Sequence, residues 1–352
     1  MVISFFFVLY VIVFFLSSIE ISSGRSIVNS PKYKKRTNVY VLIIFVLLVI
    51  IATFRPDNMA DYGNYYSLFR GWSLEEERIE IGDTLLILIS KSINNSPIFV
   101  FFVFALICIA TKLLAIKRMT PLICATIFIY ISNIFIIHDL IQIRCAISAG
   151  LFLWAIKFKC DNKPILFWTV TLLAISFHYQ AIVIVPLFFL STNKLHKYLY
   201  LSLILVSYIM AFSGIGLAKF ASLISSEGYA TLFVHYASKD SNVNLFNIIQ
   251  LLKISTFVLL LVNSNKLMIQ NKYSTFLIKV YALSICSLPL FADISAVGFR
   301  VSEFFQIAEI FLLPMIAGIE GRMKYFYRMW YYGYAISIFL IDAFYNKYLV
   351  IQ

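Results

Sequence analysis

Apolar runs separated by short polar breaks recur along the chain from residue 2 to residue 345. Most of them approach the roughly 20 residues that an α-helix needs to cross a bilayer. With 61% hydrophobic and 13% charged residues, the chain has too little polar surface to cover a water-soluble globule. The pattern predicts an all-α, polytopic membrane helix bundle of about 10–12 transmembrane helices with a re-entrant or interfacial helix. We expect one integral membrane domain over residues 1–352.

The net charge of +12 reflects basic residues that stand in short clusters between the apolar runs. Orientation signals of membrane proteins lie at such positions, so we interpret the charge as topology and expect no nucleic-acid partner. The densest cluster, within residues 25–36, predicts a cytoplasmic loop, and Lys112, Lys117 and Arg118 mark the same side. The five cysteines show neither a CxxC pair nor a metal-site spacing.

Two longer polar segments, residues 55–96 and 214–244, are predicted to be outer loops. Seven of the seventeen acidic residues lie between Asp57 and Asp83. Asp61, Tyr65 and Phe69 recur every four residues, which predicts an aromatic-rich helix at the membrane interface. A tyrosine of this helix, Tyr65 or a neighbour, could stack on a sugar.

Residues 164–190 fit either one tilted helix or two short helices that meet near His178. A single span would place every later basic cluster outside, whereas a hairpin would place them inside. We therefore expect a hairpin with His178 at its outer tip.

The stretch HDLIQIRCAISAGL, residues 138–151, places Arg144 about two turns inside an otherwise apolar helix. A cation in hydrocarbon costs at least ~2.5 kcal/mol, so it usually faces protein or a watery cavity. His138, Asp139 and Gln142 are expected to line a vestibule at the same helix end. Alternatively, Arg144 snorkels to lipid phosphates or pairs with Asp139.

The predicted topology brings four polar groups to the outer side: Arg144, His178, Asp61 and Arg300. Each has a structural alternative. Arg300 could pair with Glu303 one turn away, His178 could be a packing residue, and Asp61 could start a helix. Secondary candidates inside the spans are Glu309, Lys253 and Lys279.

No phosphate-binding G-x-x-x-x-G-K-[ST] loop, no H-E-x-x-H and no D-x-D pair occurs in the chain. An enzyme of this kind is expected to work without a bound metal, cofactor or nucleotide donor. Two arginines at one membrane face suit a phosphate or pyrophosphate, because guanidinium binds such oxygens in a bidentate fork.

Four motifs follow one another in a fixed order: D-Y-x-x-Y-Y-x-x-F at residue 61, I-R-x-A-I-S-A at 143, F-H-Y-x-A-I-V-I-x-P at 177, and F-R at 299 followed by L-P at 313. In this order, over roughly residues 40 to 320, the chain resembles the EpsG and Wzy type of bacterial surface-polysaccharide polymerases. The resemblance implies that undecaprenyl-pyrophosphate-linked oligosaccharide repeat units are joined at the outer face of the cytoplasmic (inner) membrane, to build O-antigen, capsule or exopolysaccharide.

The resemblance also implies site roles. His178 or Asp61 would accept a proton, and Arg144 with Arg300 would stabilise the pyrophosphate leaving group, with Gln142, Glu303 and Tyr65 as further substrate-binding candidates. The expected partners are the lipid-linked substrate, the bilayer and a chain-length regulator protein. A lipid-linked oligosaccharide flippase or transporter, an O-antigen ligase or acyltransferase, and a purely structural membrane subunit remain alternatives.

Overall fold

The computed structural model describes residues 2–23, 28, 30–71, 80–214 and 244–349, and these residues form helices and no strand. The contacts between them divide the chain into two compact units. Unit 1 comprises Met1–Leu190 and Leu313–Gln352, and unit 2 comprises Ser191–Leu312. The all-α class is confirmed, and the prediction of one membrane domain stays a prediction.

The helices of unit 1 are α1 (Val2–Ser22), α3 (Pro31–Thr53), α4 (Tyr62–Gly71), α5 (Ile81–Ile93), α6 (Pro97–Met119), α7 (Ile123–Ile129), η1 (Tyr130–Ile141), α8 (Ile143–Cys160), α9 (Pro164–Phe177), η2 (Tyr179–Phe189), α18 (Lys324–Leu340) and η3 (Ile341–Tyr345). Unit 2 contains α10 (Lys197–Phe212), α13 (Ile248–Val262), α14 (Ser264–Gln270), α15 (Ser274–Leu290) and α16 (Ser295–Gln306), and α17 (Glu309–Ala317) crosses the boundary.

Among the described residues, four helices are long and apolar enough to cross a membrane: α1, α3, α6 and the continuous α7–η1. The pair α13 and α14, bent by 76°, would be a fifth. Other predicted spans are shorter or interrupted. The run at 164–190 is two helices, and the run at 300–318 breaks at Ile307 between α16 and α17. The polytopic membrane class therefore holds, while fewer helices reach full span length than the apolar runs suggested.

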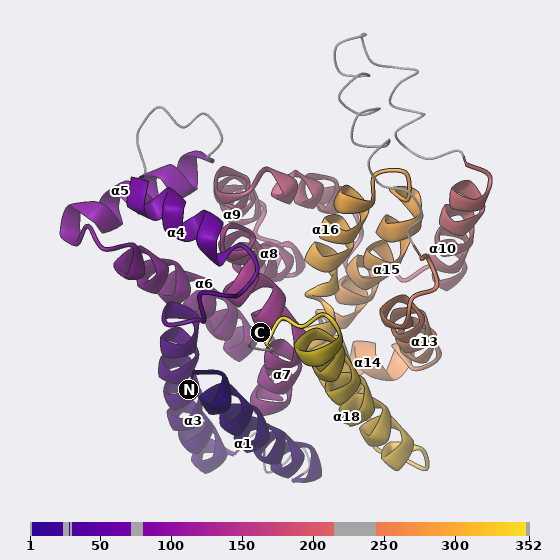
Figure 1. Cartoon of the computed structure of the whole chain (residues 1–352). Coiled ribbons are helices and arrows are strands. Elements are labelled where there is room, and N and C mark those ends of the chain that lie inside the picture. The colour runs from indigo at the N-terminus through magenta and orange to yellow at the C-terminus, as the bar shows by residue number, and fades with distance from the viewer. Residues whose placement is uncertain (1, 24–27, 29, 72–79, 215–243, 350–352) are drawn as a thin grey trace. The chain divides into compact units, whose positions relative to one another are not determined.

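The first outer segment contains the expected aromatic helix, α4, which lies beside α5 and α6 (Figure 1). Tyr62 stacks on Phe101 with ring centroids 5.4 Å apart, and Phe69 contacts Phe101 edge-on at 5.0 Å. These contacts hold α4 against the N-terminal part of α6. Nearly all of the second predicted outer loop, 214–244, lies outside the described residues.

The π-helix η1 continues α7 through His138 and Asp139 and ends only at Ile141. Both side chains are fully buried, so the expectation that they line a vestibule is wrong. The backbone turns at Gln142, whose N–H donates to the carbonyl of Ile137 at 2.8 Å. Arg144 is consequently the second residue of α8 and does not lie two turns inside a helix. Such π-helical segments frequently occur at functional sites.

A buried ion pair joins α6 to η1. Lys112 Nζ lies 2.7 Å from Asp139 Oδ1, and both side chains have no exposed surface. Tyr130 donates its hydroxyl hydrogen to the other carboxylate oxygen at 2.8 Å, and Lys112 also donates to the carbonyl of Ala146 at 2.8 Å. Lys112 is therefore a structural residue and not the cytoplasmic surface marker that its sequence neighbours Lys117 and Arg118 suggested.

The segment 164–190 forms the expected hairpin, and His178 lies at its tip between α9 and η2. The end of η2 returns to the start of α9, because the ring of Phe188 lies 5.3 Å from that of Phe167 and 5.0 Å from that of Trp168. The arms are short and apolar, as the sequence predicted.

At Gly150, α8 lies close against α6. A Cβ added there would lie 2.2 Å from Thr111 Oγ1. We expect Gly150→Ala to lower the free energy of unfolding by ~1–3 kcal/mol, because overpacking forces helices apart. Thermal unfolding of the purified protein in detergent measures the change. Gly333→Ala is the matched control, since its added Cβ meets nothing within 4 Å; an equal loss in both variants would contradict the prediction.

Unit 2 has its own buried polar contacts. Lys253 Nζ donates to Ser302 Oγ at 3.0 Å, and that hydroxyl donates to the carbonyl of Ser284 at 2.7 Å. The buried Gln306 donates its side-chain amide to Glu309 at 3.0 Å. Lys253 and Glu309, two of the three secondary candidates, therefore connect helices of the bundle. The third, Lys279, donates to the carbonyl of Ser191.

Candidate functional site

Glu80 connects the two strongest predicted site residues. Its Oε2 accepts a hydrogen bond from Arg144 at 3.0 Å, and its Oε1 lies 2.9 Å from His178 Nδ1. The three side chains come from the starts of α5 and α8 and from the tip of the α9–η2 hairpin. We call these three, together with Tyr65 and Asp83, the Glu80 cluster.

Close packing of α5 on α9 sets the position of Glu80. Gly82, two residues further on, lies so close to α9 that an added Cβ would be 2.8 Å from the carbonyl oxygen of Ser176. A larger residue at position 82 would push the start of α5 away from the hairpin tip. The glycine therefore permits the contact between Glu80 and His178.

Arg144 is more accessible than the two residues beside it, with 31% of its side chain exposed against 19% for His178 and 7% for Glu80. Its guanidinium carbon lies 5.9 Å from the centre of the Tyr65 ring, within the range of a cation–π contact. One terminal nitrogen is held by Glu80, and the buried Nε has no hydrogen-bond partner in the described part of the chain. The exposed part of this side chain could serve a phosphate oxygen.

The imidazole of His178 has one nitrogen held and one available. Glu80 holds Nδ1, and no described residue hydrogen-bonds to Nε2. In acid–base catalysis, a carboxylate on one imidazole nitrogen fixes the tautomer and orients the other nitrogen as a base. The Glu80–His178 pair has this arrangement, and 19% of the histidine side chain is exposed.

The two carboxylates of the cluster are in opposite electrostatic states. Burial alone would raise the pKa of Glu80, but its bonds to His178 and to its own backbone N–H, and the charge of Arg144, hold that pKa below its ordinary value. Burial raises the pKa of Asp83 to about 8, and repulsion by Glu80 adds to the rise. Both Asp83 oxygens are buried without a hydrogen-bond partner among the described residues. At neutral pH, Glu80 is charged and most Asp83 carboxyls are neutral.

Asp83 should make the stability of the protein depend on pH. Its folded pKa of about 8 lies above its ordinary value of 3.8, so between these values the folded protein keeps a proton that the unfolded chain has lost. The free energy of unfolding therefore falls as pH rises from about 4 to about 8. The asparagine of Asp83→Asn cannot titrate. We therefore expect the thermal midpoint of this variant, relative to that of the wild type, to rise steadily as the pH increases over this range. A constant difference over this range would contradict the assignment.

The other predicted site residues are Asp61, Gln142, Arg300 and Glu303. Asp61 is exposed at the start of α4, where its carboxylate accepts a weak hydrogen bond from Asn64 at 3.3 Å. This position matches the alternative that Asp61 starts a helix. Gln142 forms the turn before α8. Arg300, which is exposed, and the half-buried Glu303 lie on α16 in unit 2, so their role beside Arg144 stays a prediction.

Sequence reasoning did not single out Glu80 and Asp83. Both belong to the acidic group between residues 57 and 83, and no spacing there distinguishes them from their neighbours. One usable signal was Asp83 within the short apolar run 81–93, where an acid is as unusual as Arg144 in its own helix. The described residues contain no group of three or more His, Cys, Asp or Glu side chains placed to hold a metal ion.

Comparison with known proteins identifies one relative and one family. The chain is 24% identical over 312 residues to the amylovoran biosynthesis protein AmsC of Erwinia amylovora, an alignment that covers 82% of this chain and 81% of the relative. No solved structure matches the chain. The EpsG family matches residues 38–350, which include the whole Glu80 cluster, most of α3 and every described helix from α4 to η3. This polytopic membrane protein belongs to the EpsG family.

Proposed function

We propose that the protein is a polymerase of surface-polysaccharide biosynthesis that joins undecaprenyl-pyrophosphate-linked oligosaccharide units, and that the Glu80 cluster carries the reaction. Membership of the EpsG family and the similarity to an amylovoran biosynthesis protein support a role in polysaccharide biosynthesis. The observation that carries the finer proposal is the single carboxylate, Glu80, that joins an accessible arginine to an accessible histidine.

The reaction is a glycosyl transfer without a nucleotide donor. A hydroxyl oxygen of the acceptor unit forms a bond to the anomeric carbon of the donor chain, and the bond from that carbon to the pyrophosphate oxygen breaks. The hydroxyl proton passes to His178 Nε2, and the lipid pyrophosphate leaves with the bonding electrons. Glu80 holds Nδ1 and stabilises the imidazolium that forms, as carboxylates do in other acid–base pairs.

Arg144 would stabilise the negative charge that develops on the leaving pyrophosphate. Glu80 occupies only Nη1 of its guanidinium, and 31% of the Arg144 side chain remains exposed for a ligand. Fixed donors aimed at developing charge are usually the largest contribution to such reactions. Arg300 of unit 2 is proposed as a second cation for the pyrophosphate, and Tyr65 as a surface for a sugar ring.

The proposal is tested by measuring the length of the polysaccharide in cells whose only copy of the gene encodes a variant protein. Arg144→Ala should give single units in place of a ladder of chain lengths on gels of surface polysaccharide, and Arg144→Lys should recover only part of the ladder because it lacks the fork. Arg70→Ala is the control, an exposed arginine on α4 outside the cluster. A normal ladder from well-expressed Arg144→Ala protein would remove this residue from the mechanism.

A lipid-linked oligosaccharide flippase is the second candidate. It is favoured by the buried Lys112–Asp139 pair, since transporters place polar groups deep within the membrane. Lys112 and Asp139 are partners of each other, however, whereas the Glu80 cluster keeps hydrogen-bonding groups without a partner among the described residues. The proposed location is the bacterial cytoplasmic membrane with the cluster facing outward, and a chain-length regulator is a proposed partner.

A further inference from the structure

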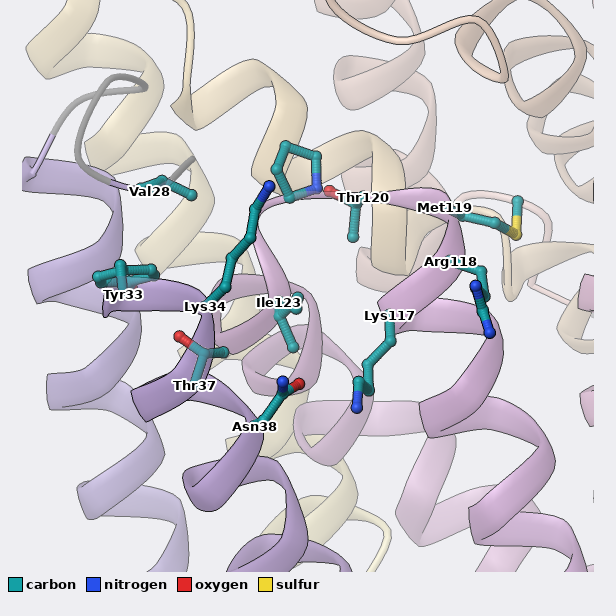
Figure 2. A pocket seen from close by; sticks show the side chains of 11 residues that line it. Val28, Tyr33, Lys34, Thr37, Asn38, Lys117, Arg118, Met119, Thr120 and Ile123 are labelled. Carbon is teal, nitrogen blue, oxygen red and sulfur yellow. The ribbon is translucent and has the colours of Figure 1, made fainter. Parts of the chain in front are cut away.

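A second polar site lies at the other end of α6. A hollow of about 380 Å³ opens between the start of α3, the end of α6 and the connection to α7. Figure 2 shows its lining side chains, which α3 and α6 contribute from facing sides. The lining residues are Val28, Tyr33, Lys34, Thr37, Asn38, Lys117, Arg118, Met119, Thr120, Pro121 and Ile123.

Three cations line this hollow, and no carboxylate does. Lys34 comes from α3, and Lys117 and Arg118 come from the last turn of α6. None of the three forms an ion pair with any residue that the structure describes. Thr37, Asn38 and Thr120 add hydroxyl and amide groups to the lining. The set consists of hydrogen-bond donors around uncompensated positive charge, which selects for an anion.

The wall of the hollow is held in place by buried contacts. Tyr33 donates its hydroxyl hydrogen to Glu20 Oε1 at 3.2 Å, and the other carboxylate oxygen accepts from the Ala125 N–H at 2.8 Å. Glu20 is buried, with 1% of its surface exposed. Ser30 caps α3 by accepting from the Tyr33 N–H at 3.3 Å. These bonds connect α1, α3 and α7, so they hold in place the start of α3, which carries Lys34.

We propose that this hollow binds a phosphate group at the membrane side opposite to the Glu80 cluster. Basic pockets between transmembrane helices on the cytoplasmic side bind anionic lipid head groups. The sequence predicts this side to be cytoplasmic, because it carries the densest basic cluster. The same donors would bind a soluble phosphate ester, so the source is either an anionic phospholipid or a free phosphate compound.

The site is separate from the proposed reaction. Tyr62 and Phe69 of α4 contact Phe101 and Phe104 near the start of α6, on the side of the Glu80 cluster, whereas Lys117 and Arg118 are at the end of this 23-residue helix. A helix of that length extends over roughly 34 Å. A result that contradicts the proposal for one site therefore does not contradict the proposal for the other.

Binding to the purified full chain in detergent tests the proposal. One arm titrates short-chain phosphatidylglycerol against phosphatidylcholine, and a second titrates inorganic phosphate at constant ionic strength, with the rise of the thermal unfolding midpoint giving an apparent Kd. The pocket variant is Lys34→Gln/Lys117→Gln/Arg118→Gln. The control variant is Lys32→Gln/Lys35→Gln/Arg36→Gln, which also removes three positive charges, all from the start of α3 near Lys34, without touching the lining.

We expect the pocket variant to bind about 100-fold more weakly, since each cation near the surface contributes roughly a factor of five, and the control variant to change little. A loss for phosphatidylglycerol alone identifies a lipid ligand, and a loss for inorganic phosphate identifies a soluble one. Equal losses in the two variants, or no binding of either probe to the wild type, would overturn the proposal. If the triple variant fails to fold, Lys34→Gln and Arg118→Gln singly should each weaken binding several-fold.

Discussion

Lys112→Met and Asp139→Leu, made singly, are each expected to lower the free energy of unfolding by about 3–5 kcal/mol, because each leaves a fully buried partner without its counter-charge. The pair is 2.7 Å apart, and neither side chain is exposed. The double variant Lys112→Met/Asp139→Leu should recover most of the loss, because it leaves no buried charge unpaired. Unfolding of the detergent-purified variants, with the single and double changes in one cycle, measures the coupling.

The same variants should also disturb the Glu80 cluster. Lys112 donates to the carbonyl of Ala146 in the first turn of α8, and Arg55 donates to the carbonyl of Leu140 at 2.7 Å just before it. These bonds fix the turn at Gln142 from which Arg144 projects. We therefore expect polymer synthesis to fall in the single variants even at temperatures where they remain folded. Full activity in a destabilised Lys112→Met protein would separate the ion pair from the site.

His178→Ala is expected to slow the joining of repeat units by about 10²- to 10⁴-fold, the usual contribution of a positioned general base. Glu80→Gln should cause a smaller loss, because it removes the charge that orients and stabilises the imidazole but leaves the base. The double variant Glu80→Gln/His178→Ala should be no slower than His178→Ala, since Glu80 acts through the histidine.

Rates with a defined lipid-linked substrate check this cycle. His196→Ala is the control, because that histidine precedes α10 in unit 2 and belongs to no part of the cluster. Additive losses in the double variant would mean that Glu80 and His178 act independently, for example with Glu80 serving Arg144 alone. That outcome would leave the ion pair with Arg144 as the only role of Glu80.

Local sequence patterns predicted the helical class, the aromatic helix α4 and the hairpin with His178 at its tip. These features follow from hydrophobic periodicity, run length and the distribution of basic residues, all of which can be read within a short window. The motif order added the family. The same patterns also identified Arg144 and His178, because a charged or titratable group next to an apolar run is conspicuous.

Partners across long stretches of sequence could not be predicted in this way. Glu80 meets Arg144 and His178 only because α5 packs on α9, and nothing near residue 80 encodes that contact. Lys112 looks like Lys117 in the sequence, yet the continuation of η1 to Ile141 brings Asp139 to it inside the bundle. Tertiary packing determines the partners of both Glu80 and Lys112, and the local sequence around each residue does not predict them.

Joining of lipid-linked units by the purified protein in detergent tests the central claim most directly, because in detergent there is no bilayer for a flippase to act across. With a fluorescent donor and an unlabelled acceptor unit, the account predicts dimers and longer chains from the wild type, and only single units from Arg144→Ala and His178→Ala proteins that retain their thermal midpoints. Chains of normal length from both variants would show that the Glu80 cluster does not carry the reaction.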